Sequence, residues 1–320
     1  MAVGRSQNVA GSVVGSEVWT LRHGTWSRFG LASGNSPTNQ KSLDSVSCPQ
    51  LGSCVTVAGP GEGYALRLSA GVWRPTPRPT APLSSVSCVS LSSCVALLPP
   101  SLQSSRNQAP YALVWNGSTW GQLALVPGPG QFTFRLAAVS CVGTSFCMAV
   151  GSSEQMPIAE AWNGSHWTIT TPQETTSGSE ELDAVSCTSS SQCFAVGTKA
   201  FDAGVNEGFG MNWNGTTWTQ PKVFSEGSFS GVACPSPTTC LAVGSIAPAN
   251  GIGPHRAVIK LWDGSAWTSL QGAAVGVAST LYAVSCSRVD WCAAVGSTAT
   301  LAGITQPPIE RWSGTSLKRM

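Results

Sequence analysis

A sixfold repeat of paired cysteines constrains the fold of this chain more than any other feature. Each copy reads Leu (or Phe)-x-x-Val-Ser (or Ala)-Cys, then five residues, then a second Cys and a short apolar segment such as Ala-Val-Gly. The copies begin near residues 43, 83, 136, 182, 229 and 281. Their mean spacing of about 48 residues is close to that of a four-stranded propeller blade.

A second motif, Trp-Asn-Gly-x-x-Trp or Trp-Asp-Gly-x-x-Trp, closes most copies and predicts a hairpin. Its clearest examples are Trp115–Trp120, Trp162–Trp167, Trp213–Trp218 and Trp262–Trp267. Asn-Gly between apolar runs favours a type I′ turn, in which both turn residues take a positive φ. Each repeat therefore predicts strand A before the first cysteine, strand B from the second cysteine, and strands C and D on either side of this turn.

These motifs predict an all-β fold: one β-propeller domain over residues 1–320, built from four-stranded antiparallel blades. The 35 Gly and 21 Pro residues also favour many short strands joined by turns. Residues 1–42 read as a partial half-repeat that supplies strands C and D. The interpretation we favour is seven blades with an incomplete first blade that lacks strands A and B, and the alternative is six blades with a loose N-terminal hairpin.

The repeat resembles the Asp-box (BNR) propellers, especially those like the photosystem II assembly factor. The string that carries the resemblance begins at Leu182 and reads LDAVSC, then CFAVG, then WNGTTW. The resemblance implies the propeller fold, here in a disulfide-bearing, secreted bacterial variant. Cysteines stand where that family carries Phe and Gly, and Trp stands where its motif carries Asp. The resemblance therefore implies no activity.

The two cysteines of each repeat bracket the hairpin between strands A and B, so they lie at facing positions of adjacent strands, where a disulfide fits. The alternative is metal binding, but zinc sites gather four ligands, usually at closer spacing. We therefore expect six local disulfides and no metal. The pairs are Cys48–Cys54, Cys88–Cys94, Cys141–Cys147, Cys187–Cys193, Cys234–Cys240 and Cys286–Cys292.

Persistent disulfides imply an oxidising compartment, so we expect the protein at the cell surface or outside the cell. The first residues contain no continuous apolar run of the kind an export signal requires. Residues 1–4 match Met148–Gly151, which directly follow a cysteine. We therefore expect a cysteine and an export signal upstream of Met1, the alternative being a true start at a degenerate half-repeat.

Charge and motifs exclude several function classes. The formal net charge is only +2, and 10% of the residues are charged, so no basic field for nucleic acid is expected. No long apolar run predicts a membrane span. No phosphate-binding loop or nucleophile elbow occurs, so we predict no cofactor and no catalytic residue. We expect a monomer.

Several residue types allow a functional and a structural interpretation. The three histidines, His23, His166 and His255, are interpreted as solvated turn residues, and the recurring Trp residues as packing between blades rather than as a carbohydrate platform. Trp291 lies off the repeat and is a candidate exposed anchor. A glycosidase pair remains an alternative among five carboxylates: Glu154, Glu160, Glu180, Glu181 and Glu207.

The connections between strands B and C, and between D and the next A, vary in length, whereas the other turns are uniform. Variable loops on a rigid scaffold usually carry specificity. We therefore predict the ligand face at Arg106, Asp202, Asn206, Glu207, His255 and Arg256. The predicted function is a secreted or cell-surface binding or scaffold module for a glycan, a wall component or a protein. The alternative is a propeller glycoside hydrolase or lyase that acts on extracellular polysaccharide.

Overall fold

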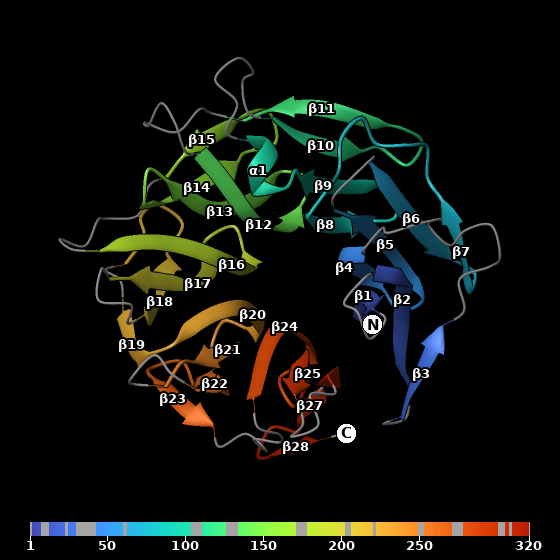
Figure 1. The fold of residues 1–320 in the computed structure, drawn as a ribbon. Coiled ribbons are helices and arrows are strands. Elements are labelled where there is room, and N and C mark those ends of the chain that lie inside the picture. Colours follow the sequence, from blue (N-terminus) through green and yellow to red (C-terminus); the bar gives the residue numbers. More distant parts are fainter. Residues whose placement is uncertain are drawn as a thin grey trace. The chain divides into compact units, whose positions relative to one another are not determined.

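In a computed structural model, the regular secondary structure of the described residues consists of strands and one short helix (Figure 1). It describes residues 2–7, 13–22, 25–29, 43–59, 63–103, 111–125, 134–170, 178–201, 206–219, 222–248, 253–270, 278–299, 305–306 and 309–319. The chain divides into two compact units: Met1–Cys147 with Ala161–Thr168, and Met148–Glu160 with Ile169–Met320. Among the described residues, no helix has the length and apolar content needed to cross a bilayer.

The first unit contains a three-stranded sheet and two four-stranded antiparallel sheets. The three-stranded sheet is formed by β1 (Ala2–Gln7), β2 (Val13–Arg22) and β3 (Thr25–Phe29). The next sheet is formed by β4 (Leu43–Gln50), β5 (Ser53–Ala58), β6 (Tyr64–Ser69) and β7 (Val72–Pro75). The third is formed by β8 (Ser85–Ser90), β9 (Ser93–Leu97), β10 (Tyr111–Trp115) and β11 (Trp120–Ala124), with the short helix α1 (Pro100–Gln103) between β9 and β10.

One four-stranded sheet has residues in both units, and it follows the same order along the chain. It is formed by β12 (Phe134–Gly143), β13 (Phe146–Ser153), β14 (Met156–Trp162) and β15 (Trp167–Ile169).

The second unit contains three further antiparallel sheets. The first is formed by β16 (Ser179–Ser189), β17 (Gln192–Ala200), β18 (Asn206–Trp213) and β19 (Lys222–Glu226). The second is formed by β20 (Ser228–Ser236), β21 (Thr239–Ile246), β22 (Arg256–Trp262) and β23 (Trp267–Leu270). The third is formed by β24 (Ala278–Arg288), β25 (Trp291–Ala299), β27 (Ile309–Trp312) and β28 (Leu317–Arg319), with β26 (Thr305–Gln306) pairing with β25 as a fifth strand.

Six blades, each a sheet with strands of types A to D, are present among the described residues, which matches the six-bladed alternative. The seven-bladed interpretation that we favoured is not confirmed. The N-terminal segment differs from both expectations, because it forms three strands rather than two. The extra strand β1 contains Ala2, Val3 and Gly4 and pairs with β2 from Ala2↔Trp19 to Gln7↔Val13. It therefore corresponds to strand B of the incomplete first blade, which was expected to lack strands A and B.

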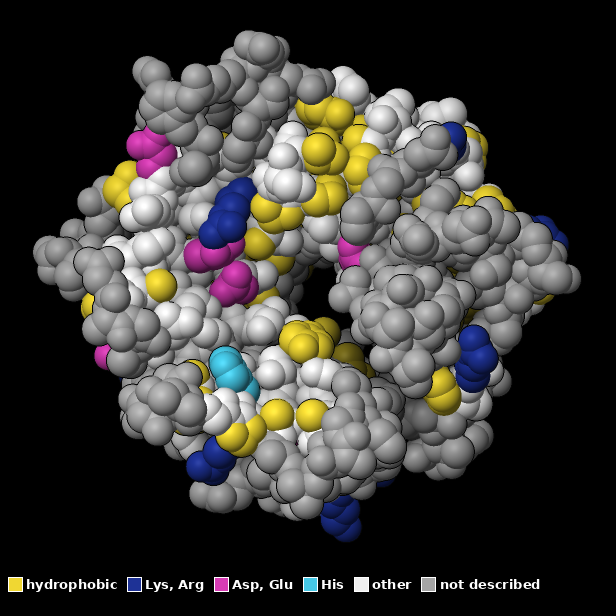
Figure 2. All heavy atoms as spheres, viewed as in Figure 1, with side chains coloured by type: hydrophobic (Ala, Val, Ile, Leu, Met, Phe, Trp, Pro, Cys, Tyr) yellow, Lys and Arg dark blue, Asp and Glu magenta, His cyan; other side chains and the backbone are white. Residues whose placement is uncertain are grey.

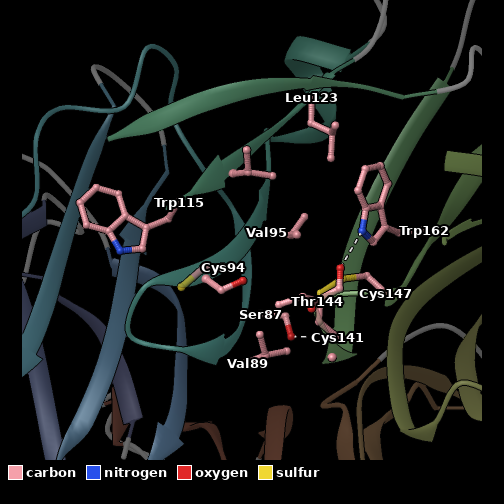
Figure 3. A pocket seen from close by; sticks show the side chains of 13 residues that line it. Ser87, Val89, Cys94, Val95, Trp115, Leu123, Cys141, Thr144, Cys147 and Trp162 are labelled. Carbon is pink, nitrogen blue, oxygen red and sulfur yellow. Dashed lines mark hydrogen bonds between the residues drawn. A yellow bond between two sulfur atoms is a disulfide. The ribbon is translucent and has the colours of Figure 1, made fainter. Parts of the chain in front are cut away.

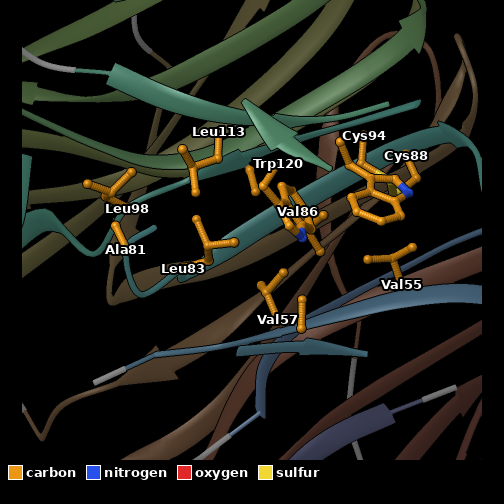
Figure 4. Close-up of a cluster of buried hydrophobic side chains, with 13 residues drawn as sticks. Val55, Val57, Ala81, Leu83, Val86, Cys88, Cys94, Leu98, Leu113 and Trp120 are labelled. Atoms are coloured by element: carbon orange, nitrogen blue, oxygen red, sulfur yellow. A yellow bond between two sulfur atoms is a disulfide. The ribbon is translucent and has the colours of Figure 1, made fainter. Parts of the chain in front are cut away.

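Strand B forms the buried centre of each blade. In β5, for example, Cys54 to Ala58 are all buried, and Val55 and Val57 face Leu83 and Val86 of the next blade in the chain (Figure 4). Burial on both faces of the sheet explains why strand B reads as a continuous apolar run rather than an alternating one.

The glycine of the Ala-Val-Gly segment is required by a β-bulge in strand A. The register of β16 against β17 shifts between Leu182 and Ala184, which brings the strand A backbone close to Gly197. A Cβ atom at Gly197 would lie 1.8 Å from the carbonyl oxygen of Glu181. In the following blades, a Cβ atom on Gly244 or Gly296 would lie 1.9 Å from a strand A carbonyl oxygen, that of Ser228 or Thr280. In these three blades a glycine therefore fits where a side chain would meet the strand A backbone, whereas Ala58 occupies the same position beside the register shift between Leu43 and Ser45.

At three junctions the serine of the Val-Ser-Cys motif joins one blade to the next. The Oγ of Ser47 accepts a hydrogen bond from the backbone N–H of Cys88 at 2.9 Å, and the Oγ of Ser87 accepts one from Cys141 at 2.9 Å. Ser186 accepts the equivalent bond from Cys234 at 3.0 Å. The motif therefore recurs because its serine satisfies a backbone donor in the neighbouring strand A.

The six expected disulfides are present, each between the two cysteines of one repeat. In three of the blades the paired cysteines are direct register partners, as in Cys187↔Cys193. All twelve cysteines are used, and none is free. In the loop-closure model, each bond contributes about 2 kcal/mol by restricting the unfolded chain.

The turn between strands C and D is not the type I′ turn that the sequence predicts. Gly117 has a φ of +96°, but Asn116 is not among the residues with positive φ. Instead, the Oδ1 of Asn116 accepts hydrogen bonds from the backbone N–H groups of Ser118 and Thr119 at 2.9 and 2.8 Å. Asp263 forms the same turn, and hydrogen bonds from Ala266 and Ser265 lower the pKa of its carboxyl from 3.8 to about 2. The side chain at this position therefore organises the turn.

The two Trp residues that flank this turn are largely buried and hydrogen-bonded. Trp115 donates from Nε1 to the carbonyl of Leu91 at 2.9 Å within its own blade. Trp120 donates to the Oγ1 of Thr76 at 3.0 Å in the preceding blade. Both side chains are less than 10% exposed, and their ring centroids lie 5.3 Å apart. These contacts correspond to a packing role rather than to a carbohydrate platform.

Candidate functional site

The predicted ligand face lies at one edge of the blades, where strand A begins, strand B ends and strand C begins. In the blade β16–β19, Ser179 pairs with Ala200, which in turn pairs with Asn206. Asn206 and Glu207 open β18, while Arg256 opens β22 directly after His255. Arg106 and Asp202 lie outside the described residues.

Gly227 lies between the predicted ligand-face residue Asn206 and Ser245. Its backbone N–H donates to the carbonyl of Asn206 at 2.9 Å, and a Cβ atom on Gly227 would lie 2.9 Å from the carbonyl of Ser245. Its φ of +121° is a conformation that favours glycine. The structure therefore places the start of β18 beside the end of β21.

Ser245 extends this region to His255. The Oγ of Ser245 and the Nδ1 of His255 lie 3.4 Å apart, and the His255 carbonyl accepts a hydrogen bond from the Ser279 N–H at 2.8 Å. Ser245 is 9% exposed, whereas His255 and Arg256 are exposed. The backbone contacts hold the histidine in place, and its ring remains available to a ligand.

A row of charged residues crosses the blade β16–β19 at the same edge. Glu180 pairs in register with Lys199, which pairs with Glu207 on the next strand. The Lys199 ammonium lies 3.0 Å from a Glu180 carboxylate oxygen, and both side chains are less than 10% exposed. The same ammonium lies 5.4 Å from the centre of the Phe201 ring. The buried pair leaves Glu207 as the more accessible carboxylate of this row.

The carboxylates considered as a glycosidase pair differ strongly in accessibility. Glu160 is fully buried, and Glu180 is 3% exposed and held by Lys199. Glu154 is exposed in the tight turn between β13 and β14, where its φ is +48°. On the face drawn in Figure 2, Lys or Arg and Asp or Glu side chains lie together in one group, and the other charged side chains of described residues are scattered among uncharged ones. No group of three potential metal ligands occurs in the described ranges.

The other residues singled out in the sequence have local roles where they are described. His166 is exposed in its turn, with its Nε2 3.2 Å from the Nδ2 of Asn163. Asp183 accepts a hydrogen bond from Thr198 at 3.1 Å across the strand A bulge. The Trp291 ring lies 5.8 Å from the Arg311 guanidinium. His23 lies outside the described residues.

Sequence reasoning did not identify Ser245 or Lys199 as neighbours of the predicted face. A signal for Ser245 was present, because a hydroxyl residue follows the Ala-Val-Gly glycine in several repeats, as at Thr198 and Ser297. Each of these hydroxyls contacts a polar side chain, for instance Ser297 with the Tyr282 hydroxyl at 2.9 Å. The repeated hydroxyl therefore marks a polar position at the end of strand B.

No family model matches the chain, and no curated protein sequence matches it. Solved structures do match its fold. One is YCF48 from Cyanidioschyzon merolae, with 15% identity, a TM-score of 0.55, and coverage of 88% of this chain and 85% of that one. A second is YCF48 bound to D1 peptide, with 12% identity, a TM-score of 0.54, and coverage of 87% and 80%.

A third is the GH74 xyloglucanase from Xanthomonas campestris, with 12% identity and a TM-score of 0.57; the match covers 87% of this chain but 45% of that one. At these identities the likeness concerns the fold alone. The sheets and these neighbours together identify the chain as a β-propeller of four-stranded antiparallel blades.

Proposed function

We propose that this protein is an exported or cell-surface propeller that serves as a binding or scaffold module for a glycan, a wall component or a protein. The observation that carries the proposal is the edge formed by Asn206, Glu207, Ser245 and His255, where Asn206 and His255 are exposed and their carbonyls accept backbone hydrogen bonds. Six disulfides favour an oxidising compartment. YCF48, a structural neighbour, has been solved with a bound D1 peptide.

The test begins with immobilised protein and two probe sets, a glycan array and a peptide array. For a probe that binds, Glu207→Ala and His255→Ala should each weaken binding at least tenfold without a change in melting temperature. Leu51→Ala is the control, because Leu51 is fully exposed in the hairpin between β4 and β5, at the opposite end of its blade. If Leu51→Ala or Trp291→Ala abolishes binding while the first two variants do not, the ligand face is wrongly assigned.

The alternative is a glycoside hydrolase or lyase that acts on extracellular polysaccharide. The xyloglucanase neighbour supports this alternative, because it is an enzyme of this kind with a similar fold. Among the carboxylates of the predicted pair, Glu154 is exposed and Glu181 and Glu207 are partly exposed, so these are the ones that this hypothesis requires. Release of reducing sugar from xyloglucan or wall polysaccharide, lost in Glu207→Gln, would favour it over the binding module.

Domain organisation and assembly remain part of the proposal. We infer one propeller domain over residues 1–320, with β1–β3 as an incomplete first blade of seven. The pairing of β1, β2 and β3 in the order of strands B, C and D supports this count. We also propose a monomer that binds no nucleic acid, which the small net charge of +2 favours.

A further inference from the structure

An apolar cavity of about 140 Å³ lies where β12 packs against β8 and β9 (Figure 3). All of its lining residues belong to the first unit. The side chains of Val95, Leu123 and Trp162 face the space from β9, β11 and β14. None of the lining residues is charged.

Two polar groups at the cavity wall are already engaged. Trp162 donates from Nε1 to the carbonyl of Thr144 at 3.0 Å. The Oγ of Ser87 accepts the hydrogen bond from the Cys141 N–H at 2.9 Å. A ligand would therefore meet a largely apolar surface that is partly open to solvent, and its binding would depend on shape and on the apolar area that it buries.

The repeat shows what normally fills this space. Val95 directly follows the second cysteine of its repeat, and the equivalent residue two repeats later is Phe194. The Phe194 ring packs against the two Trp residues of the following blade, with centroid distances of 5.5 Å to Trp262 and 6.1 Å to Trp267. Trp162 is the counterpart of Trp262 in the blade that follows Val95. Where Phe194 inserts a phenyl ring, Val95 inserts only an isopropyl group.

A second junction shows another way of closing the gap. Val55 occupies the same position as Val95, but it is fully buried in a cluster that includes Trp115, with Leu91 packed against it. The counterpart of Leu91 in the following repeat is Thr144, which is smaller and polar. The junction at Val95 therefore has a small residue at both filling positions, which accounts for the cavity there.

We propose that this cavity binds one neutral aromatic ring of the size of benzene or toluene, in the place that Phe194 fills in its own junction. An apolar cavity of about 150 Å³ is large enough to bind benzene. The Trp162 ring supplies a flat aromatic wall, against which a second ring can pack edge-to-face or offset. This site is separate from the proposed ligand face and does not depend on it.

Titration of the full chain with toluene, followed by calorimetry and thermal unfolding, tests the proposal. We expect saturable binding at one site and a rise in melting temperature for the wild type. Val95→Phe should fill the cavity with a covalent phenyl group and weaken toluene binding at least tenfold. Leu51→Ala, which changes a fully exposed residue, should bind as the wild type does.

Thr144→Leu provides an independent filling variant, because it copies Leu91 and approaches the space from the opposite blade. It keeps the test decisive if Val95→Phe does not fold. The proposal is overturned if the wild type shows no saturable toluene binding. It is equally overturned if a folded Val95→Phe or Thr144→Leu variant binds toluene within twofold of the wild type, since the ring would then lie elsewhere.

Discussion

Ser47→Ala tests whether the serines of the repeated motif join the blades. The substitution removes the acceptor for the Cys88 N–H, whose hydrogen bond to the Ser47 Oγ is 2.9 Å long. Cys88 is 8% exposed, so water replaces the lost acceptor poorly. A buried backbone donor left without a partner costs about 1–3 kcal/mol. We expect the free energy of unfolding to fall by that amount.

Chemical denaturation followed by Trp fluorescence measures this change, and Ser92→Ala is the matched control. Ser92 is exposed in a hairpin, and its Oγ contacts only the Ser90 hydroxyl, at 3.1 Å. Removing it should change the free energy of unfolding by less than about 0.5 kcal/mol. The reasoning fails if the two variants are equally stable. Ala233→Ser extends the test, because Ala233 is the one alanine at this motif position and a serine there should stabilise the chain.

Three further predictions concern single side chains. Residue 123 has the position in its repeat that Thr76 has in the preceding one, and Thr76 accepts the hydrogen bond of Trp120. The buried Nε1 of Trp167 has no such partner among the described residues, so Leu123→Thr should supply one and raise the free energy of unfolding by about 1 kcal/mol. Denaturant unfolding that shows no gain would contradict this. Val55→Phe should destabilise the protein by about 1–3 kcal/mol, because its junction is already filled, whereas a stabilising effect would refute the packing argument. The ionised Asp263 carboxyl stabilises the wild type, and this contribution is lost as the pH falls from about 3.8 to about 2, because its pKa is lowered in the folded state. Asp263→Asn should lack this pH-dependent loss of stability. Identical profiles of melting temperature against pH for the two proteins would exclude this contribution.

Much of the fold follows from the sequence because each repeat encodes its strands locally. The paired cysteines mark facing positions in strands A and B, and the register Cys88↔Cys94 confirms this. The turn type was predicted wrongly at Asn116, since its side chain satisfies the two turn donors without a positive φ. The strand β1 (Ala2–Gln7) was not counted, although residues 1–4 match the strand B segment Met148–Gly151.

The candidate site was less predictable because it depends on contacts between repeats. Asn206 and Ser245 are 39 positions apart in the chain, and Gly227 places them together through its backbone. Loop length identified the edge at which Glu207 and His255 lie, but no spacing rule gives the Ser245–His255 contact. The Glu180–Lys199 ion pair could not be predicted from the sequence either, since the register that pairs these residues depends on the bulge in β16.

The residues that define the repeat are largely engaged in bonds within and between blades, and this limits where function can lie. The motif cysteines are in disulfides, the motif serines accept backbone hydrogen bonds, and Trp115 and Trp120 donate within or between blades. A ligand therefore has to be recognised by residues that depart from the repeat. Two such places are the ends of strands B and C near His255, and the junction where Val95 and Thr144 are both small. Both places are accessible to substitution without loss of the bonds that hold the blades, so each can be tested separately from the fold.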